Sequence, residues 1–339
     1  MGRVDPAEPP EVSYSRKRIG LCDSTSRGLR NLAPGGSPGE GATTSLQRVD
    51  IAMPTNRFEL EGRPAPSELI TDVILQLTSH ASVRSYRPDP LPEGVVEVIV
   101  TAAQSASTSS NLQNYSIIAV QDPERRRLLA ELSENAHVAE APLFLVFCPD
   151  LRRMELICEK LGYPFADRGM EMFIQAVVDT ALAAQNAAVA AESLGLGICM
   201  IGGIRNQTAK VAELLHLPPR TFALVGMTVG YPAAPAKLRH RLPLDVVLHR
   251  EVYCDENLWD GLRRYDEVTA RSGIYAGRQL APAPGSARAP QTAHESSGVQ
   301  QQAEPRLYGW TEHSARRMAR PNAKRANMKV QLEALGWEF

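Results

Sequence analysis

One long apolar segment, residues 169–193, constrains this chain more than any other feature. Its length and composition predict a helix with apolar side chains around most of its circumference, and such a helix is buried in a domain core or at a subunit interface. Polar residues, among them Glu171, Asp179 and Glu192, interrupt the segment, so it lacks the ~20 apolar residues that a membrane span requires. We therefore expect a core or interface helix and no membrane partner.

Shorter patterns around this helix predict the other elements of the core. Residues 67–77 and 92–104 have helical periodicity, and Ser67 is a plausible N-cap. Short apolar runs, many of them β-branched, predict strands at residues 116–120, 143–147, 198–201 and 222–229. Because strand and helix do not alternate regularly, an α+β layer fold fits better than a doubly wound parallel sheet.

Two stretches of biased composition border the ordered region. Residues 1–50 hold seven Gly and five Pro without apolar periodicity, so they cannot bury enough surface to offset their chain entropy. Residues 281–305 hold four Pro, four Gln and no aromatic residue, which predicts a flexible surface insertion. We expect a disordered tail at 1–64, a core at 65–276, and a C-terminal excursion at 277–339 with the insertion and terminal helices.

Charge and cysteine content exclude several classes of protein. The 37 Lys and Arg against 38 Asp and Glu give a net charge of −1, without the basic excess of a dedicated nucleic-acid binder. The five cysteines form no CxxC pair and leave one over in any pairing scheme, so a disulfide framework and a zinc ribbon are not expected. A reducing, cytoplasmic compartment fits this usage. The seven histidines are scattered, and we expect no metal site.

Three polar clusters offer groups that could bind a ligand. In the segment His80-Ala81-Ser82-Val83-Arg84, a hydroxyl and a guanidinium two residues apart in an extended turn can face one anion. The loop at 108–113 is rich in neutral donors and acceptors, which suits a heterocycle or a sugar chain. Gly202 and Gly203 follow an apolar strand and allow a flat ligand to approach the backbone.

A fourth cluster, Arg239-His240-Arg241, places two guanidiniums on one side of an extended segment. Paired guanidiniums suit a phosphate, because each offers several fixed N–H donors. By itself, each of three clusters is better explained without a ligand: residues 80–84 as a helix cap with a solvated arginine, 108–113 as an ordinary loop and 239–241 as a solvated basic turn. A plain turn explains Gly202 and Gly203 equally well. Together the four clusters predict a site for an aromatic cofactor that bears a phosphate.

The order and spacing of the clusters, from about residue 79 to the C-terminus, resemble the FMN-dependent nitroreductases, in particular the NADPH-type nitroreductase A and flavin reductase group. The family's opening His-Arg-Ser-x-Arg turn, serine-rich loop, central helix and Lys-x-Arg-Leu-Pro segment correspond to residues 80–84, 109–113, 177–197 and 239–243, with further matches at 201–206 and 335–337. Two positions depart from the pattern. Ala81 replaces the family arginine, and Asn135 stands where the subgroup tends to have Gln.

The resemblance implies a nitroreductase-type α+β fold: a central mixed, mostly antiparallel sheet flanked by helices, in an intertwined homodimer with FMN at the interface. In the turn that begins at His80, Ser82 would hold the phosphate together with Arg239 and Arg241. Arg84 would lie near N1 and O2 of the flavin, where negative charge collects on reduction. The amides of Gln113 and Asn135 would hydrogen-bond the pyrimidine edge of the flavin ring. The backbone of Gly202 and Gly203 would also contact the ring. The loop at Thr108, Ser109 and Ser110 would reach it from the partner subunit.

The implied activity is that of an FMN-dependent NAD(P)H oxidoreductase that passes two electrons to a nitroaromatic, a quinone or a flavin by ping-pong chemistry. No side chain would act as nucleophile or strong base. Arg278, which follows Gly277 near a flexible hinge, would contact the extra phosphate of NADPH. Two alternatives stay open: a flavin enzyme of the same fold that fragments flavin or dehalogenates reductively, and a non-catalytic flavin-binding protein, which Ala81 motivates.

Overall fold

The computed structural model describes residues 55–63, 65–282 and 308–339, so most of the predicted tail and insertion lies outside the described residues. Its centre is a four-stranded sheet in the order β1-β2-β4-β3. All three neighbouring pairs of strands are antiparallel, as the expected mostly antiparallel sheet requires. The strands are β1 (Tyr115–Val120), β2 (Leu143–Pro149), β3 (Gly197–Ile201) and β4 (Val225–Gly230).

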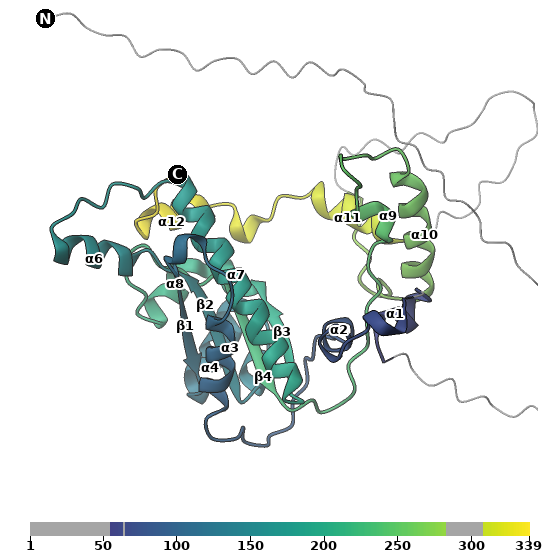
Figure 1. The fold of residues 1–339 in the computed structure, drawn as a ribbon, viewed down its shortest axis with the longest axis horizontal. Coiled ribbons are helices and arrows are strands. Elements are labelled where there is room, and N and C mark those ends of the chain that lie inside the picture. The colour runs from purple at the N-terminus through teal and green to yellow at the C-terminus, as the bar shows by residue number, and fades with distance from the viewer. Residues whose placement is uncertain (1–54, 64, 283–307) are drawn as a thin grey trace, which may run out of the picture.

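One face of the sheet is covered by α7 (Met170–Ser193), with α3 (Val95–Gln104) beside it (Figure 1). The face of α7 toward the sheet is built from alanines, including Ala183, Ala187 and Ala191, which pack on apolar residues of β2, β3 and β4. Small side chains let the helix backbone approach the strands closely, so this helix fixes the position of the sheet.

Shorter helices cover the opposite face of the sheet. Because successive side chains of β2 point to opposite faces, Phe144 and Val146 belong to this second core while Leu145 and Phe147 pack toward α7. Every residue of β2 is buried, which explains its nearly continuous apolar sequence. The covering elements are α4 (Pro123–Ser133), α5 (His137–Glu140), the 3₁₀ helix η3 (Gly202–Gln207) and α8 (Thr208–Leu214).

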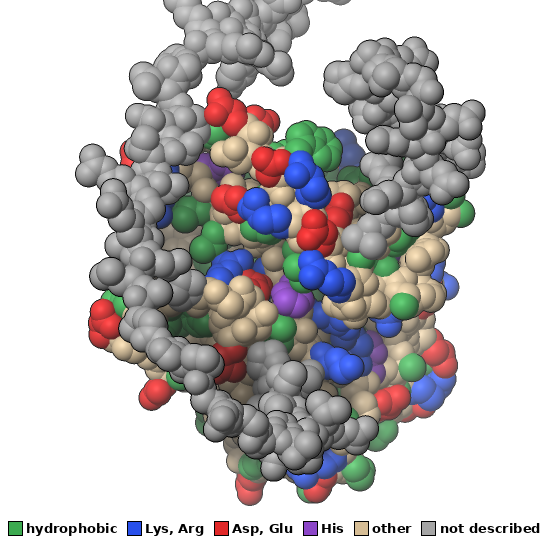
Figure 2. Space-filling model, turned by 90° about the vertical axis from the view of Figure 1, so that its right-hand side faces the viewer, with side chains coloured by type: hydrophobic (Ala, Val, Ile, Leu, Met, Phe, Trp, Pro, Cys, Tyr) green, Lys and Arg blue, Asp and Glu red, His purple; other side chains and the backbone are tan. Residues whose placement is uncertain are grey.

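A group of helices lies apart from the sheet, at the right of Figure 1, and we call it the arm. It comprises α1 (Arg57–Glu61), α9 (Leu244–Val247), α10 (Leu258–Arg271) and α11 (Trp310–Met318). Residues 231–243, which we call the strap, lead from β4 into the arm. Figure 2 faces the arm and shows Lys, Arg and His side chains gathered in the middle of that face.

After the arm, the chain returns to the core through η4 (Ala323–Arg325) and α12 (Met328–Ala334). The ring of Trp337 packs edge-on against Phe173 and Phe222, with ring centroids 5.2 and 5.5 Å away. The remaining helices lie elsewhere along the core: α2 (Asp72–Thr78) contacts α7, and α6 (Arg152–Leu161) projects at the far left of Figure 1.

The predicted helix at 67–77 is wrong as a single element. Residues Ser67–Leu69 form a short 3₁₀ helix, η1, and α2 begins only at Asp72. The physical reason is a competing cap: Ile70 is extended, and the Thr71 hydroxyl accepts the backbone N–H of Ile74 at 3.4 Å. Thr71, and not Ser67, therefore caps the helix that leads into the His80 turn.

Three other predicted boundaries also shift. The helix expected at 92–104 begins at Val95, because Gly94 adopts a left-handed φ of 77°. The strand expected from residue 222 begins at Val225. Within the stretch predicted as a disordered tail, residues 57–61 form α1, with Asn56 as its N-cap and Gly62 as its left-handed C-cap.

The outer face of α7 carries an exposed apolar stripe. Met170, Ile174, Val178 and Leu182 are spaced four residues apart, and each is more than two-fifths exposed. Among the described residues, α7 is the one helix that is long and apolar enough to cross a membrane by composition. Its inner face packs on the sheet, as the expected core or interface helix does.

The packing of β4 on β2 gives a test of this core. A Cβ at Gly226 would lie 2.1 Å from Cζ of the fully buried Phe144 ring. We predict that Gly226→Ala lowers the free energy of unfolding by about 1–3 kcal/mol, measured by urea denaturation, because an overpacked core forces its side chains to shift. Adding Phe144→Leu, which removes the tip of the ring, should recover part of the loss. Strict additivity of the two changes would contradict the contact.

Candidate functional site

The turn at residues 80–84 is anchored at both ends. His80 Nδ1 lies 2.6 Å from Oε1 of Glu192, near the end of α7. The backbone N–H of Val83 donates to the carbonyl of Ile198 in β3 at 2.8 Å, and a Cβ at Gly197 would lie 2.5 Å from the Val83 side chain. Between these anchors, Ser82 is half-buried and Arg84 is exposed.

The two adjacent glycines, Gly202 and Gly203, lie where β3 passes into η3, as predicted. A Cβ at Gly203 would lie 2.3 Å from the carbonyl oxygen of Ser133 and 2.4 Å from Nδ2 of Asn135. Only glycine can therefore bring this backbone so close to the end of α4. Asn135 donates through Nδ2 to the Ser133 carbonyl at 2.6 Å, which places the predicted amide beside the predicted glycines.

Arg84 faces the same region from the neighbouring turn. Its positive charge acts on His137 and on the buried thiol of Cys199 in β3. Burial, followed by the nearby Arg84 charge, lowers the pKa of His137 below its ordinary value. His137 Nε2 is buried and has no hydrogen-bond partner within the described part of the chain. The turn thus lies along the first residues of β3, while Asn135 lies beside the glycines where the strand ends.

The loop at 108–113 has an unusual backbone. Ser110, Asn111 and Gln113 are left-handed, with φ of 50°, 54° and 53°. Non-glycine residues avoid this region, and such conformations persist only where the surroundings hold them. Three of them within four residues indicate a loop that is shaped for a purpose rather than an ordinary connection.

The group that holds this loop is Asp179, which is 1% exposed in the middle of α7. Its Oδ1 accepts the backbone N–H of Ser109 at 2.9 Å, and its Oδ2 accepts that of Asn114 at 3.3 Å. One buried carboxylate therefore ties down both ends of the left-handed stretch. In the sequence, Asp179 stands out only as a polar interruption of an apolar segment, and its place in the middle of that segment was the available signal.

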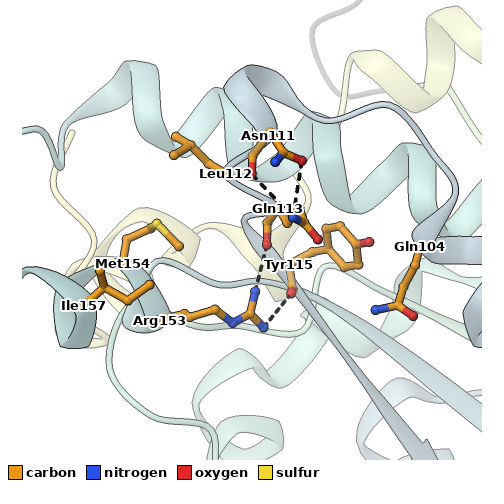
Figure 3. A pocket seen from close by; sticks show the side chains of 8 residues that line it. All are labelled: Gln104, Asn111, Leu112, Gln113, Tyr115, Arg153, Met154 and Ile157. Carbon is orange, nitrogen blue, oxygen red and sulfur yellow. Dashed lines mark hydrogen bonds between the residues drawn. The ribbon is translucent and has the colours of Figure 1, made fainter.

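Beyond this loop lies a pocket of about 430 Å³ (Figure 3). The Gln113 side chain lies back over Asn111, with Nε2 3.3 Å from Asn111 Oδ1. From the other side, Arg153 of α6 donates to the carbonyls of Gln113 and Tyr115 at 2.8 and 3.2 Å. The loop and α6 thus enclose a polar pocket on the outer side of the core, lined by Gln104, Asn111, Leu112, Gln113, Tyr115, Arg153, Met154 and Ile157.

The strap carries the predicted arginine pair. The backbone of Ala233 donates to the Ser85 carbonyl at 3.0 Å, and that of Arg87 donates to Tyr231 at 2.9 Å. Because these bonds join antiparallel segments, the strap continues past Ala233 in the direction of Ser82. Arg239 and Arg241 then lie exposed at its far end, where it enters the arm, and Arg278 lies exposed beyond α10.

One basic residue that the sequence analysis missed reaches the glycines. The Arg325 guanidinium in η4 donates to the Gly202 carbonyl at 2.8 Å and to Oδ1 of Asn206 at 3.0 Å. No motif marked Arg325, because it lies more than a hundred residues away along the chain. The returning C-terminal segment thus brings a cation to the end of β3.

This arrangement defines an α+β protein in which the predicted turn, amide and glycines border one edge strand, β3, of a four-stranded antiparallel sheet. Residues 77–231 match the nitroreductase family. The chain is 42% identical over 187 residues to a Bacillus subtilis FMN reductase (NADPH), covering 54% of this chain and 75% of the relative. It is 44% identical over 198 residues to an oxygen-insensitive NADPH nitroreductase of Salmonella typhimurium, covering 57% and 79%. The chain belongs to the nitroreductase family.

A solved structure agrees with this assignment. NfrA1 of B. megaterium superposes with a TM-score of 0.67 and 36% identity, covering 79% of this chain and 100% of that one. NADPH:FMN oxidoreductase of Vibrio harveyi, solved with NAD⁺, gives a TM-score of 0.64 at 30% identity. The nitroreductase-type fold expected from the sequence is confirmed.

The role of Asp179 can be tested directly. We predict that Asp179→Asn lowers the free energy of unfolding by about 1–3 kcal/mol, because an amide can accept only one of the two backbone N–H groups. Amide hydrogen exchange at Ser109 and Asn114 should become faster. Glu171→Gln, at an exposed position of the same helix, is the matched control and should leave both measurements nearly unchanged. Unchanged exchange in the Asp179 variant would show that other contacts hold the loop.

Proposed function

We propose that the chain is an FMN-dependent NAD(P)H oxidoreductase of the nitroreductase and flavin reductase type. The observation that carries this proposal is the arrangement along β3: the turn with the exposed Arg84 is bonded to the first residues of the strand, and Asn135 lies beside the Gly202–Gly203 backbone where the strand ends. The family match and the names of the relatives, FMN reductase and NADPH nitroreductase among them, support the same activity.

The residues present fit FMN. Gly203 packs its backbone against Ser133 and Asn135, which holds the Gly202–Gly203 main chain beside the amide that the resemblance assigns to the flavin edge. His137 Nε2 is an orphaned buried polar atom beside Arg84, and a heterocycle with donors and acceptors at its edge could satisfy it. Exposed guanidiniums at Arg239 and Arg241 suit the phosphate. Ala81 brings no charge to the turn, which leaves Ser82 and the strap to hold that group.

FMN, when bound, supplies the redox chemistry: it accepts a hydride from NAD(P)H and passes two electrons to an acceptor. The protein contributes binding, orientation and charge. Arg84, fixed by the turn on β3, would place a cation where negative charge collects during reduction, and a preorganised charge of this kind stabilises the transition state. The lowered pKa of His137 keeps that ring neutral near Arg84, so it adds no competing positive charge.

We infer that the loop at Thr108, Ser109, Ser110 and Gln113 serves the site of a second copy in a homodimer. Two features support this. Asp179 gives the loop a fixed, left-handed shape, and the exposed stripe on α7 supplies an apolar face close to it along the same helix. A contiguous apolar face of this kind marks an interaction surface.

For the reaction partners, we propose NADPH or NADH as donor and a nitroaromatic, quinone or flavin as acceptor. The relatives include an NADPH-flavin oxidoreductase of Vibrio harveyi and a Cr(VI) reductase of a Pseudomonas species, which indicates a range of acceptors in this family. Arg278, exposed beside the left-handed Gly277, stays our candidate for the extra phosphate of NADPH.

A flavin assay tests the proposed function. The purified protein should absorb at about 450 nm, bleach on addition of NADPH and recover with an acceptor such as a quinone. We predict that Arg84→Gln keeps FMN bound but slows its reduction by about 10²-fold, measured by stopped-flow absorbance. Arg263→Gln, in an exposed ion pair on α10, is the control and should react at the wild-type rate. Bleaching without turnover of any acceptor would favour a flavin-binding protein, and loss of FMN from the Arg84 variant would make Arg84 a binding residue.

The dimer has a separate test. We predict that light scattering at micromolar concentration gives twice the chain mass of 37.0 kDa. Val178→Asp, in the middle of the stripe, should shift the protein toward a monomer because it buries an unpaired charge at the interface. Val330→Asp, at an exposed apolar position on α12 outside the stripe, should leave the mass unchanged. A wild-type monomer that retains FMN would contradict the shared site.

A further inference from the structure

Helix α1 is short, but it has a cap at each end. It precedes the residues that match the family, which begin at residue 77. At its start, the Asn56 side chain accepts the Glu59 N–H at 3.1 Å, and the Glu59 carboxylate accepts the Thr55 N–H at 2.8 Å. At its end, Gly62 turns left-handed with a φ of 59°. Five residues do not hold a helix by themselves in water, so the caps and the contacts with the arm must hold this one.

The main contact of α1 is a carboxylate directed at the strap. The Glu61 side chain is 7% exposed, and its Oε1 accepts the backbone N–H of Arg241 at 3.0 Å. The same carboxylate lies 2.6 Å from the Arg63 guanidinium and 3.8 Å from Nε of Arg57. Arg63 also donates to the Leu242 carbonyl at 3.3 Å. Helix α1 is therefore fixed on the strap at the predicted phosphate-binding pair.

The charges in this cluster do not balance. Arg57 and Arg63 share the single carboxylate of Glu61, and the charge of Arg241 acts on Arg57, so three guanidiniums meet one carboxylate and leave two positive charges in excess. Arg57 Nε is buried and lacks a hydrogen-bond partner within the described residues. Burial first, and then the charge of Arg241, lowers the pKa of the Arg57 guanidinium. Guanidiniums that share one carboxylate, repel one another and leave a buried N–H without a partner are the arrangement that an anion stabilises.

The shape of the cluster favours a phosphate monoester. Guanidinium forks match the oxygens of a phosphate with two N–H donors each, and a dianion would compensate the excess of two charges. Tyr265 of α10 fixes the neighbouring strap by donating its hydroxyl to the His240 carbonyl at 3.0 Å. Figure 2 shows basic side chains in the middle of the face on which the arm lies, with acidic side chains interspersed above them.

We propose that α1 completes a phosphate-binding site in which Arg57 and Arg63 act with Arg241, while Glu61 positions all three. The ligand is a phosphate monoester, a group that FMN and NADPH both carry. The existence of this phosphate site does not depend on the proposed function, and only the identification of its ligand as FMN or NADPH rests on it. It gives the N-terminal segment just before the family region a direct part in holding a cofactor.

Equilibrium binding to the full-length protein tests the site without relying on turnover. The apoprotein is titrated with FMN and with riboflavin by flavin fluorescence, and with NADP⁺ and NAD⁺ by calorimetry. Arg57→Gln and Arg63→Gln remove one charge each and keep a polar side chain. Arg271→Gln is the matched control, because this exposed arginine pairs only with its own helix neighbour Glu267 among the described ion pairs.

The two ligands of each pair differ by one phosphate: FMN carries one that riboflavin lacks, and NADP⁺ carries one that NAD⁺ lacks. If the site holds the FMN phosphate, both variants weaken FMN binding about tenfold or more while riboflavin binding stays constant. If it holds the phosphate of the nucleotide, NADP⁺ binding weakens by that factor while NAD⁺ binding stays constant. Either result supports the site and names its ligand. Equal weakening within both pairs, or no weakening in either, overturns it.

The binding titrations can contradict the phosphate site without contradicting the proposed oxidoreductase function, and the reverse also holds. A wild-type protein that takes up neither FMN nor riboflavin would contradict the proposed oxidoreductase, whereas the NADP⁺ and NAD⁺ titrations would still test the cluster. In the converse case, the wild-type protein is yellow and active while the Arg57 and Arg63 variants bind all four ligands as tightly as it does. That result would support the proposed function and contradict the phosphate site. Circular dichroism of each variant checks that the arm helices remain folded.

Discussion

The close contact between the alanine face of α7 and the sheet is the constraint on which the rest of the structure depends. Ala183, Ala187 and Ala191 allow the helix to lie directly on β2, β3 and β4, and larger residues there would push the layers apart. The same helix carries Asp179 on its buried side and ends beside Glu192, which anchors His80. Displacing α7 would therefore disturb both the 108–113 loop and the turn on β3.

The site combines two kinds of fixed backbone. Around β3, close packing fixes the backbone, because Gly197 and Gly203 leave no room for a Cβ. In the 108–113 loop, a buried carboxylate holds three left-handed residues that would otherwise relax. Both devices position main-chain groups more than side chains. This suits a reaction in which the cofactor carries the chemistry and the protein provides orientation.

The sequence predicted the core well because its signals were local. The length of the apolar segment and the β-branched runs located α7 and all four strands, and motif order indicated the family, now confirmed by the match at residues 77–231. What the sequence could not supply depends on distant contacts. Nothing near Arg325 indicates that it reaches Gly202, and the cap at Thr71 that divides the expected helix is one of several equivalent hydroxyls. Helix α1 was missed because its five residues are held by the strap, which lies 180 positions later.

The return of the C-terminus to the core has a consequence for biosynthesis. Trp337, two residues from the end, closes the aromatic cluster with Phe173 and Phe222, and the Leu335 carbonyl accepts the Arg220 N–H at 2.6 Å. This part of the core can therefore close only after residues 335–337, and with them the whole arm, have been synthesised. Until then a nascent chain exposes those phenyl rings to chaperones and proteases. Synthesis of the arm and closure of this aromatic cluster are thus coupled in time.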